Sequence, residues 1–198
     1  MASFVVGHII SFIALRMVRN NMKFKEFEED IIRNYVKGNI LDLGCGFGRL
    51  YSTLSELGSY TGIDISKEGM EEARTNYPQG NFIEMDAGNL GFEDNSFDIV
   101  FAGFNVIDEV EDLPNTFIEV KRILKPNGLF IFSMHNKYYL KQIIREYTVK
   151  RNDKTIIPRS QSIREMINLC SVHLDIEKVY GNIFTPYPYF ICRKVDRE

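Results

Sequence analysis

Cysteine is scarce in this sequence of 198 residues, and the placing of the few cysteines excludes two common architectures. The three cysteines, Cys45, Cys170 and Cys192, are far apart, odd in number and include no C-x-x-C pair. Such a set indicates neither a disulfide framework nor a zinc site. We therefore expect no bound metal and a protein of the reducing cytoplasm.

The sequence also lacks an excess of positive charge. It contains 24 Lys and Arg residues against 27 Asp and Glu residues, which gives a formal net charge of -3 and a pI near 5.7. A general nucleic-acid-binding domain shows the opposite balance. We expect no nucleic-acid partner.

No apolar run reaches the length of a transmembrane helix. Residues 1–15 carry no formal charge, but the run stops at Arg16, whereas a spanning helix needs about 20 apolar residues. A signal peptide would have a basic start and a small-residue cleavage site, and this segment has neither. The run has one apolar helical stripe, formed by Val6, Ile10, Ile13 and Met17.

Three interpretations of this N-terminal stripe stay open: a helix packed over the binding site, a dimer surface, or an amphipathic helix in contact with a membrane through residues 1–18. A second amphipathic helix follows, with Phe24, Phe27 and Ile31 on its apolar face, and Gly38 ends it. We expect residues 1–36 to form a helical cap and residues 37–198 to form one α/β domain.

The stretch from Asn39 to Leu50 organises the rest of the chain. Its apolar start reads as a buried parallel strand, and the glycines at 44, 46 and 48 separate that strand from a helical pattern. Glycines at such a turn let a ligand lie against the main chain, and the helix N-terminus favours an anionic group. Asp42 at the end of the strand would attract a cation, so the implied ligand carries both charges.

A dinucleotide is the first candidate for this loop, but the match fails at one position. The dinucleotide fingerprint needs a small residue where this sequence has Arg49, because helix and strand must approach closely there. The pattern D-x-G-x-G-x-G, in contrast, fits from Asp42 to Gly48 without exception.

Two further strands end in an acid. Asp64 ends the strand that starts near Tyr60, and Asp86 ends the strand that starts at Asn81. An acid at the end of the second strand is placed to accept ribose hydroxyls. Three successive strands that each end in a carboxylate at one edge of a sheet predict a nucleoside site.

In these stretches the chain resembles the class I S-adenosylmethionine-dependent methyltransferases, and among them the small domains that include quinone-biosynthesis enzymes. The resemblance is carried by residues 41–48, 62–66, 81–87, 92–98 and 122–129. It implies a Rossmann-like, doubly wound sheet of seven strands, mostly parallel with an antiparallel last strand. It also implies S-adenosyl-L-methionine as the cofactor and S-adenosyl-L-homocysteine as the product.

The resemblance assigns roles to individual residues. Asp42 and the loop backbone at Gly44 to Gly46 would meet the methionine end, Asp64 the ribose, Ile65 the adenine face, and Asp86 with the Ala87 amide the adenine amine. Cys45 in the loop is expected to fill space rather than to act as a nucleophile. The predicted cofactor-binding residues are Asp42, Gly44, Cys45, Gly46, Asp64, Ile65, Asp86, Ala87 and Phe104.

The predicted catalytic residues follow the fourth and fifth strands. No proline occurs in residues 103–110, which argues against the N-P-P-Y-like turn of enzymes that methylate nucleic acid bases or glutamine. Asn105 and Asp108 are candidates to contact the acceptor, although Asp108 also fits as a helix-start acid. His135 is the best general-base candidate, and its alternative is a hydrogen bond to a loop carbonyl.

Residues 137–159 interrupt the compact plan with seven basic residues against two acids. This segment is expected either to cover the site and bind an acidic acceptor or, more commonly for such charge, to form a solvated amphipathic helix with a loop. A helix near residues 163–169, a strand near 174–180 and a last strand near 187–195 complete the expected sheet.

These observations together predict a methyltransferase that moves a methyl group from S-adenosylmethionine to an O or N atom of a small-molecule acceptor. Two alternatives stay open: a non-catalytic protein that binds the cofactor as a partner, and a membrane-surface enzyme that acts on a lipid or quinone. A nicotinamide-dependent oxidoreductase is disfavoured by Arg49. A homodimer is compatible with the sequence.

Overall fold

The computed structural model describes residues 25–104, 106–137, 161–182, 185 and 187–195, and the backbone alone of residues 149–151 and 154–156. The chain divides into two compact units, Met1–Val36 and Lys37–Glu198. In the first unit, residues 25–35 form a helix in which Ile31 and Ile32 are buried. The predicted stripe from Val6 to Met17 lies outside the described residues.

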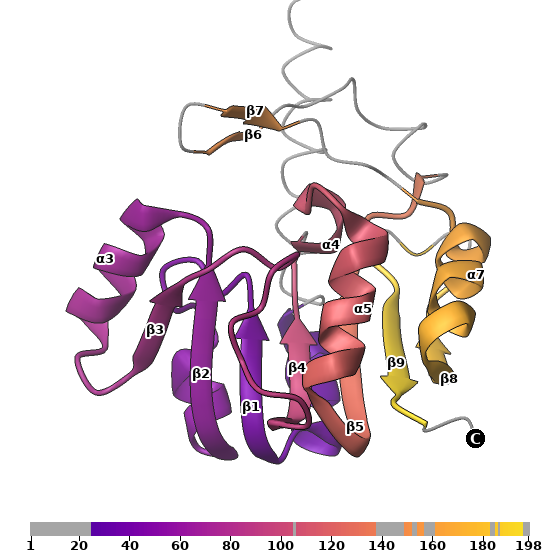
Figure 1. Cartoon of the computed structure of the whole chain (residues 1–198), viewed down its shortest axis with the longest axis horizontal. Coiled ribbons are helices and arrows are strands. Elements are labelled where there is room, and N and C mark those ends of the chain that lie inside the picture. Colours follow the sequence, from indigo (N-terminus) through magenta and orange to yellow (C-terminus); the bar gives the residue numbers. More distant parts are fainter. Residues whose placement is uncertain are drawn as a thin grey trace, which may run out of the picture. The chain divides into compact units, whose positions relative to one another are not determined.

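The second unit is built on a seven-stranded sheet with the order β3-β2-β1-β4-β5-β9-β8 (Figure 1). Its strands are β1 (Gly38–Leu43), β2 (Gly58–Asp64), β3 (Asn81–Glu84), β4 (Phe97–Ala102), β5 (Leu124–Ser133), β8 (Asp175–Tyr180) and β9 (Tyr189–Arg193). The pairs from β3 to β5 are parallel, and β9 runs antiparallel to both of its neighbours. The predicted fold class, with an antiparallel last strand, is confirmed.

The order of the strands places the site. The chain moves outward from β1 to β2 and β3 on one side, then returns to lay β4 against the other side of β1. In open α/β sheets a ligand binds at the carboxyl ends of the strands where the order reverses in this way. That position is the end of β1, where Asp42 and the glycine loop lie.

The helices cover the sheet from α2 (Tyr51–Ser55) and α3 (Lys67–Asn76) through α4 (Val106–Glu109) and α5 (Leu113–Ile123) to α7 (Ile163–His173). Helices α5 and α7 lie side by side over one face of the sheet (Figure 1). Under them, the ring of Phe117 packs edge-on against Phe130 and Phe132, and Phe132 stacks on Phe190 with 5.0 Å between ring centroids. The apolar core therefore fixes β5 and β9 beneath α5.

Local sequence signals explain where the helices begin. The Ser66 hydroxyl caps α3 by accepting a hydrogen bond from the Gly69 amide, and Asp112 caps α5 in front of Pro114 in its first turn. Helix α7 begins with a capping box in which Ser162 and Glu165 each accept the other's amide hydrogen. These caps set the loops that connect each helix to the preceding strand.

The segment after β5 contains an element that the sequence analysis did not predict. The backbone of its described residues forms an antiparallel hairpin of β6 (Val149–Arg151) and β7 (Lys154–Ile156), while residues 138–148, where the expected amphipathic helix would begin, lie outside the described residues. Val149, Thr155 and Ile156 are β-branched and favour strands, and a two-residue Asn-Asp connection favours a hairpin. The charge of the segment concealed this pattern.

No described helix combines the length and the apolar character that a membrane crossing demands.

Candidate active site

The glycine loop after β1 is shaped by backbone conformations that glycine adopts readily. Gly44 has a φ of +72°, and a Cβ added there would lie 2.4 Å from a methyl group of Val106 in α4. Gly46 has a φ of +54°, but a Cβ there would meet nothing within 4 Å. Gly44 therefore permits close packing against α4, whereas Gly46 leaves an open surface against which a ligand can lie.

Asp64 ties the end of β2 to this loop. Its Oδ2 accepts a hydrogen bond from the Gly46 amide at 2.9 Å, and its Oδ1 accepts one from the Ser66 amide at 2.8 Å. The residue is 6% exposed. The carboxylate is thus fixed in orientation, and a carboxylate oxygen is able to accept more than one hydrogen bond.

The amides of the glycine loop are already engaged within the protein. Gly44 and Cys45 both donate to the Ile63 carbonyl, at 2.8 and 2.9 Å, and the Gly46 amide donates to Asp64. The loop therefore offers a ligand its open face and the adjacent carboxylates rather than these three N–H groups.

Asp42 is buried at the end of β1 and has a partner that the sequence analysis missed. The Tyr60 hydroxyl donates a hydrogen bond to Asp42 Oδ2 at 3.0 Å. Burial and the nearby Asp42 raise the pKa of Tyr60, so the phenol keeps its proton. A Cβ at Gly62 would lie 2.5 Å from the Tyr60 hydroxyl oxygen, so the glycine directly opposite Asp42 makes room for this contact.

Cys45 fills space in the loop as expected. It is 5% exposed, and burial, together with Asp42 and Asp64, raises the pKa of its thiol. A nucleophilic cysteine needs a lowered pKa. The three cysteines are all buried and free.

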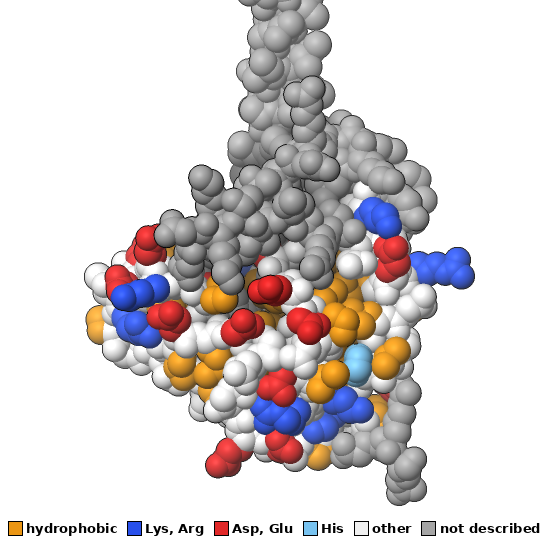
Figure 2. Space-filling view, turned by 45° about the horizontal axis from the view of Figure 1, so that its top comes forward, with side chains coloured by type: hydrophobic (Ala, Val, Ile, Leu, Met, Phe, Trp, Pro, Cys, Tyr) orange, Lys and Arg blue, Asp and Glu red, His pale blue; other side chains and the backbone are white. Residues whose placement is uncertain are grey.

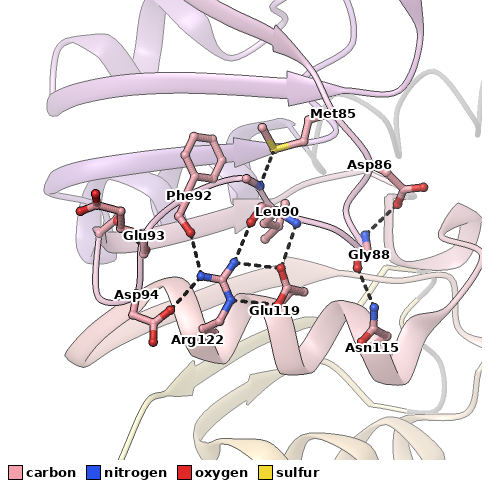
Figure 3. Close-up of polar contacts among 12 residues, drawn as sticks. Met85, Asp86, Gly88, Leu90, Phe92, Glu93, Asp94, Asn115, Glu119 and Arg122 are labelled. Atoms are coloured by element: carbon pink, nitrogen blue, oxygen red, sulfur yellow. Dashed lines mark hydrogen bonds and ion pairs between the residues drawn. The ribbon is translucent and has the colours of Figure 1, made fainter.

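Asp86 follows β3 and is exposed. The Met85 amide donates to the Asp64 carbonyl at 3.0 Å, which holds the ends of β2 and β3 together. Asp86 Oδ1 accepts a hydrogen bond from the Gly88 amide at 2.7 Å, at the start of the loop that leads along α5 (Figure 3). Ala87 is partly buried beside it.

Two exposed apolar residues follow β2 and β4. Ile65 is 47% exposed and Phe104 is 45% exposed. Phe104 has a φ of +49°, which is rare for a bulky residue, and its amide donates to the Ser133 hydroxyl at 2.9 Å. The Arg49 guanidinium carbon lies 5.8 Å from the centre of the Phe104 ring, so this arginine meets an aromatic ring where a dinucleotide fold would need a small residue.

The structure brings together two of the three predicted catalytic residues. His135 follows β5, Asp108 lies in α4, and both side chains are buried. Asp108 Oδ2 lies 2.9 Å from the ring Nδ1 of His135 and also accepts the His135 amide at 2.8 Å. The partner of this histidine nitrogen is thus a carboxylate rather than a loop carbonyl. Asn105 lies outside the described residues.

The two carboxylate oxygens of Asp108 differ in their hydrogen bonding. Its Oδ1 is buried and has no hydrogen-bond partner within the described part of the chain. Burial raises the pKa of Asp108, and the contacts with His135 oppose that rise. The centre of the Tyr187 ring lies 4.9 Å from the centre of the His135 ring and 6.0 Å from that of Phe104.

Several Asp and Glu side chains lie together in the middle of the view in Figure 2, and a mixed group of acidic and basic side chains lies below them.

Comparison with known proteins shows which methyltransferases this chain is similar to. A family described as "Methyltransferase domain" matches residues 41–132. The putative methyltransferase YqeM of Bacillus subtilis is 31% identical over 144 residues, which are 69% of this chain and 58% of that protein. A demethylmenaquinone methyltransferase of Chlorobaculum tepidum is 40% identical over 91 residues, which are 45% of this chain and 37% of that protein.

A solved structure gives the same result for the fold. An S-adenosylmethionine-dependent methyltransferase from Clostridium acetobutylicum superposes with a TM-score of 0.74 at 19% identity, over 86% of this chain and 89% of that one. The predicted resemblance to class I S-adenosylmethionine-dependent methyltransferases is confirmed. The chain spans 58% or less of the length of the two relatives named above.

The second unit presents residues that suit S-adenosyl-L-methionine, the cofactor that the resemblance in the sequence implies. An open surface over Gly46 accommodates a ligand against the backbone, and the carboxylates of Asp42 and Asp64 suit an ammonium group and a pair of hydroxyls. The exposed side chains of Ile65 and Phe104 offer apolar contact to a base. The side chains around the glycine loop and this ligand thus match in charge and polarity.

Several residues around this site could not be found from the sequence. Tyr187 lies far along the chain from both His135 and Phe104 and is brought to them only by the path that leads into β9. Ser133 reads as an ordinary strand residue until its hydroxyl is seen to hold the Phe104 amide. Tyr60 could have been found, because the register of β1 and β2 puts it on the same face as Asp42.

Proposed function

We propose that this protein transfers a methyl group from S-adenosylmethionine to an O or N atom of a small-molecule acceptor. The proposal rests mainly on one observation: three adjacent strands have the carboxylates Asp42, Asp64 and Asp86 at or just beyond their carboxyl ends, and an open glycine loop follows the first of these strands. A ligand with an ammonium group, a ribose and an amino-substituted base uses all three acids. The methyltransferase relatives support the same conclusion.

Each acid has a distinct role in this proposal. Asp42 attracts the ammonium group of the methionine end, and the Tyr60 hydroxyl holds its carboxylate in place. Asp64 accepts the ribose hydroxyls, while Asp86 and the Ala87 amide recognise the adenine amine. Ile65 and Phe104 flank the base.

Orientation is the main contribution of the protein to the reaction. When bound, the sulfonium supplies a methyl group that is already activated for displacement. Well-oriented reactants reach effective molarities of about 10⁵–10⁸ M, so a site that holds the acceptor in line needs little covalent assistance. The buried strand ends fix the side chains that would provide this orientation.

His135 is the residue that we propose as proton acceptor. With its Nδ1 hydrogen directed to Asp108, the other ring nitrogen carries the lone pair, which can accept a proton from an acceptor hydroxyl or ammonium group. The neighbouring ring of Tyr187 favours a planar, apolar acceptor. The quinone-type relative in Chlorobaculum tepidum supports the inclusion of hydroquinones among the candidates.

A methyl-transfer assay tests the proposal. Cofactor with a labelled methyl group would be offered with phenols, hydroquinones and primary amines, and labelled product would be separated from the cofactor. We expect transfer to at least one aromatic hydroxyl or amine. In the His135→Gln variant, kcat should fall by about 10²–10⁴-fold if general-base catalysis is fully used. The cofactor Kd of this variant should be unchanged. Cofactor binding without transfer to any acceptor class would favour the alternative of a non-catalytic binding protein.

A further inference from the structure

The loop between β3 and β4 is fastened to α5 by three side chains, Asn115, Glu119 and Arg122 (Figure 3). We propose that these three residues, named here the α5 clamp, determine the selectivity of the site for adenine over other bases. The inference rests on the proposed function, because it takes Asp86 and Ala87 as the residues that meet the base. It adds positioning residues that do not themselves touch the ligand.

Arg122 is the centre of the α5 clamp. Its Nη2 donates to the Leu90 carbonyl at 2.6 Å, and its Nη1 donates to the Phe92 carbonyl at 2.7 Å and to Asp94 Oδ1 at 2.9 Å. Its Nε and Nη2 also form a two-point contact with the Glu119 carboxylate at 2.9 Å each. A planar guanidinium with five donors suits such an arrangement, and the single ammonium of lysine does not.

Glu119 and Asn115 extend the α5 clamp toward Asp86. Glu119 Oε2 accepts the Leu90 amide at 2.9 Å, and Asn115 Nδ2 donates to the Gly88 carbonyl at 2.6 Å. The Gly88 amide in turn donates to Asp86 Oδ1. An unbroken series of hydrogen bonds therefore leads from α5 to the carboxylate that we assign to the adenine amine.

This series matters because it reaches the Asp86 carboxylate itself, whereas the buried side chain of Leu90 and the contact of the Gly91 amide with Met85 Sδ fix other points of the loop. Asp86 is exposed, and the loop contains the conformationally free residues Gly88 and Gly91. A carboxylate discriminates an amine from a carbonyl oxygen only when it is held where the amine will be, since hydrogen bonds weaken steeply with misalignment. The α5 clamp supplies that fixed position from a helix anchored in the core.

The substitution Asn115→Asp tests the positioning of the loop separately from the stability of the protein. Asn115 lies in the first turn of α5, where an acid is favourable beside the helix N-terminus. Asn115→Asp keeps the size of the side chain and suits the helix, but it replaces the N–H donor that holds the Gly88 carbonyl with an oxygen. Lys121→Ala, on the same helix but outside the α5 clamp, is the matched control. Arg122→Lys keeps the charge and removes the planar fork.

Calorimetric titration with two ligands tests the inference. The ligands are S-adenosylhomocysteine and its deaminated form S-inosylhomocysteine, which has a carbonyl oxygen in place of the adenine amine. The unaltered protein should prefer the adenine form by about tenfold or more, as expected for a hydrogen bond to a charged group. Asn115→Asp and Arg122→Lys should reduce this preference at least about threefold, while the melting temperature of Asn115→Asp is kept and Lys121→Ala retains the full preference.

The outcomes distinguish the two proposals. A protein that binds neither ligand would contradict the proposed function itself. Binding of both ligands with equal affinity would overturn the role of the α5 clamp and remove the assignment of Asp86 to the adenine amine, although methyl transfer itself would stand. A full preference retained in Asn115→Asp would overturn the role of the α5 clamp alone and leave the proposed function in place. Equal losses of affinity for both ligands in Asn115→Asp would assign the α5 clamp a structural role only, which also overturns the inference.

Discussion

Asp108 Oδ2 receives two contacts from one residue, the backbone amide of His135 at 2.8 Å and the ring Nδ1 of His135 at 2.9 Å. The carboxylate thereby joins α4 to the end of β5 and orients the imidazole at the same time. A carboxylate that accepts a ring N–H selects the tautomer whose other nitrogen is a base. This arrangement is the physical reason for the assignment of His135 as proton acceptor.

The tautomer of His135 can be measured without knowledge of the acceptor. We expect nitrogen-15 NMR at pH 7.5 to show a protonated Nδ1 and an unprotonated Nε2. The chain contains three histidines, so the His135→Gln variant assigns the signal. Asp108→Asn should disturb this tautomer, because the amide is a poorer acceptor than a carboxylate. A His135 ring that carries its proton on Nε2 in the unaltered protein would contradict the proposed role.

Asp64 should be indispensable for the cofactor. We expect Asp64→Ala to weaken S-adenosylhomocysteine binding by about 100-fold or more, because two hydrogen bonds to a charged group are each worth about 1.5–3 kcal/mol. The comparison is Asp98→Asn, since Asp98 contacts Asn39 and Lys125 at the opposite end of the sheet. Calorimetry should find that the Asp98 variant binds normally. Retained affinity in Asp64→Ala would remove the ribose assignment.

The features predicted from sequence are those with a local pattern. The strands ending at Asp42 and Asp64, and Asp86 just after β3, were predicted because each acid follows its own apolar run. The Asp108 and His135 candidates were found separately, but their contact depends on how α4 meets β5 and no local pattern contains it.

Contacts between distant segments were the features that sequence analysis missed. The stretch around Arg122 predicted a helix followed by a turn, whereas its side chain binds a loop about 30 residues earlier in the chain. The hairpin of β6 and β7 was missed for a different reason. Its high charge favoured an exposed helix, although its β-branched residues already pointed to strands.

The stability of the α5 clamp should depend on pH in a predictable direction. The paired Arg122 guanidinium is the main cause that lowers the pKa of Glu119 below its ordinary value of 4.5. A carboxylate with a lowered folded-state pKa stabilises the protein above its unfolded pKa, and this contribution is lost as the pH falls through the folded-state pKa. The contribution should therefore be complete at pH 6–7 and decrease below pH 4.5.

Urea denaturation from pH 3.5 to pH 7 checks this direction. The difference in unfolding free energy between the unaltered protein and Glu119→Gln should be constant near neutral pH and should shrink as the medium becomes more acidic. Glu72→Gln, on an exposed part of α3, controls for the loss of one negative charge. A difference that grows on acidification would show that Glu119 is not stabilised by the Arg122 pair.

Two glycines of the same loop should respond differently to an added methyl group. At Gly44, alanine brings a Cβ to 2.4 Å from Val106 at a φ of +72°, so overpacking of about 1–3 kcal/mol adds to a backbone cost of about 1–2 kcal/mol. At Gly46, only the backbone cost applies, because a Cβ meets nothing within 4 Å. Gly44→Ala should therefore lose more unfolding free energy than Gly46→Ala in urea denaturation.

Gly46→Ala should instead lose affinity for S-adenosylhomocysteine by about tenfold or more, since its methyl group occupies the surface that the ligand would contact and overpacking costs about 1–3 kcal/mol. If calorimetry finds full affinity in folded Gly46→Ala, the cofactor does not lie against this loop, because no ligand could pack on the Gly46 backbone and also tolerate a methyl group there.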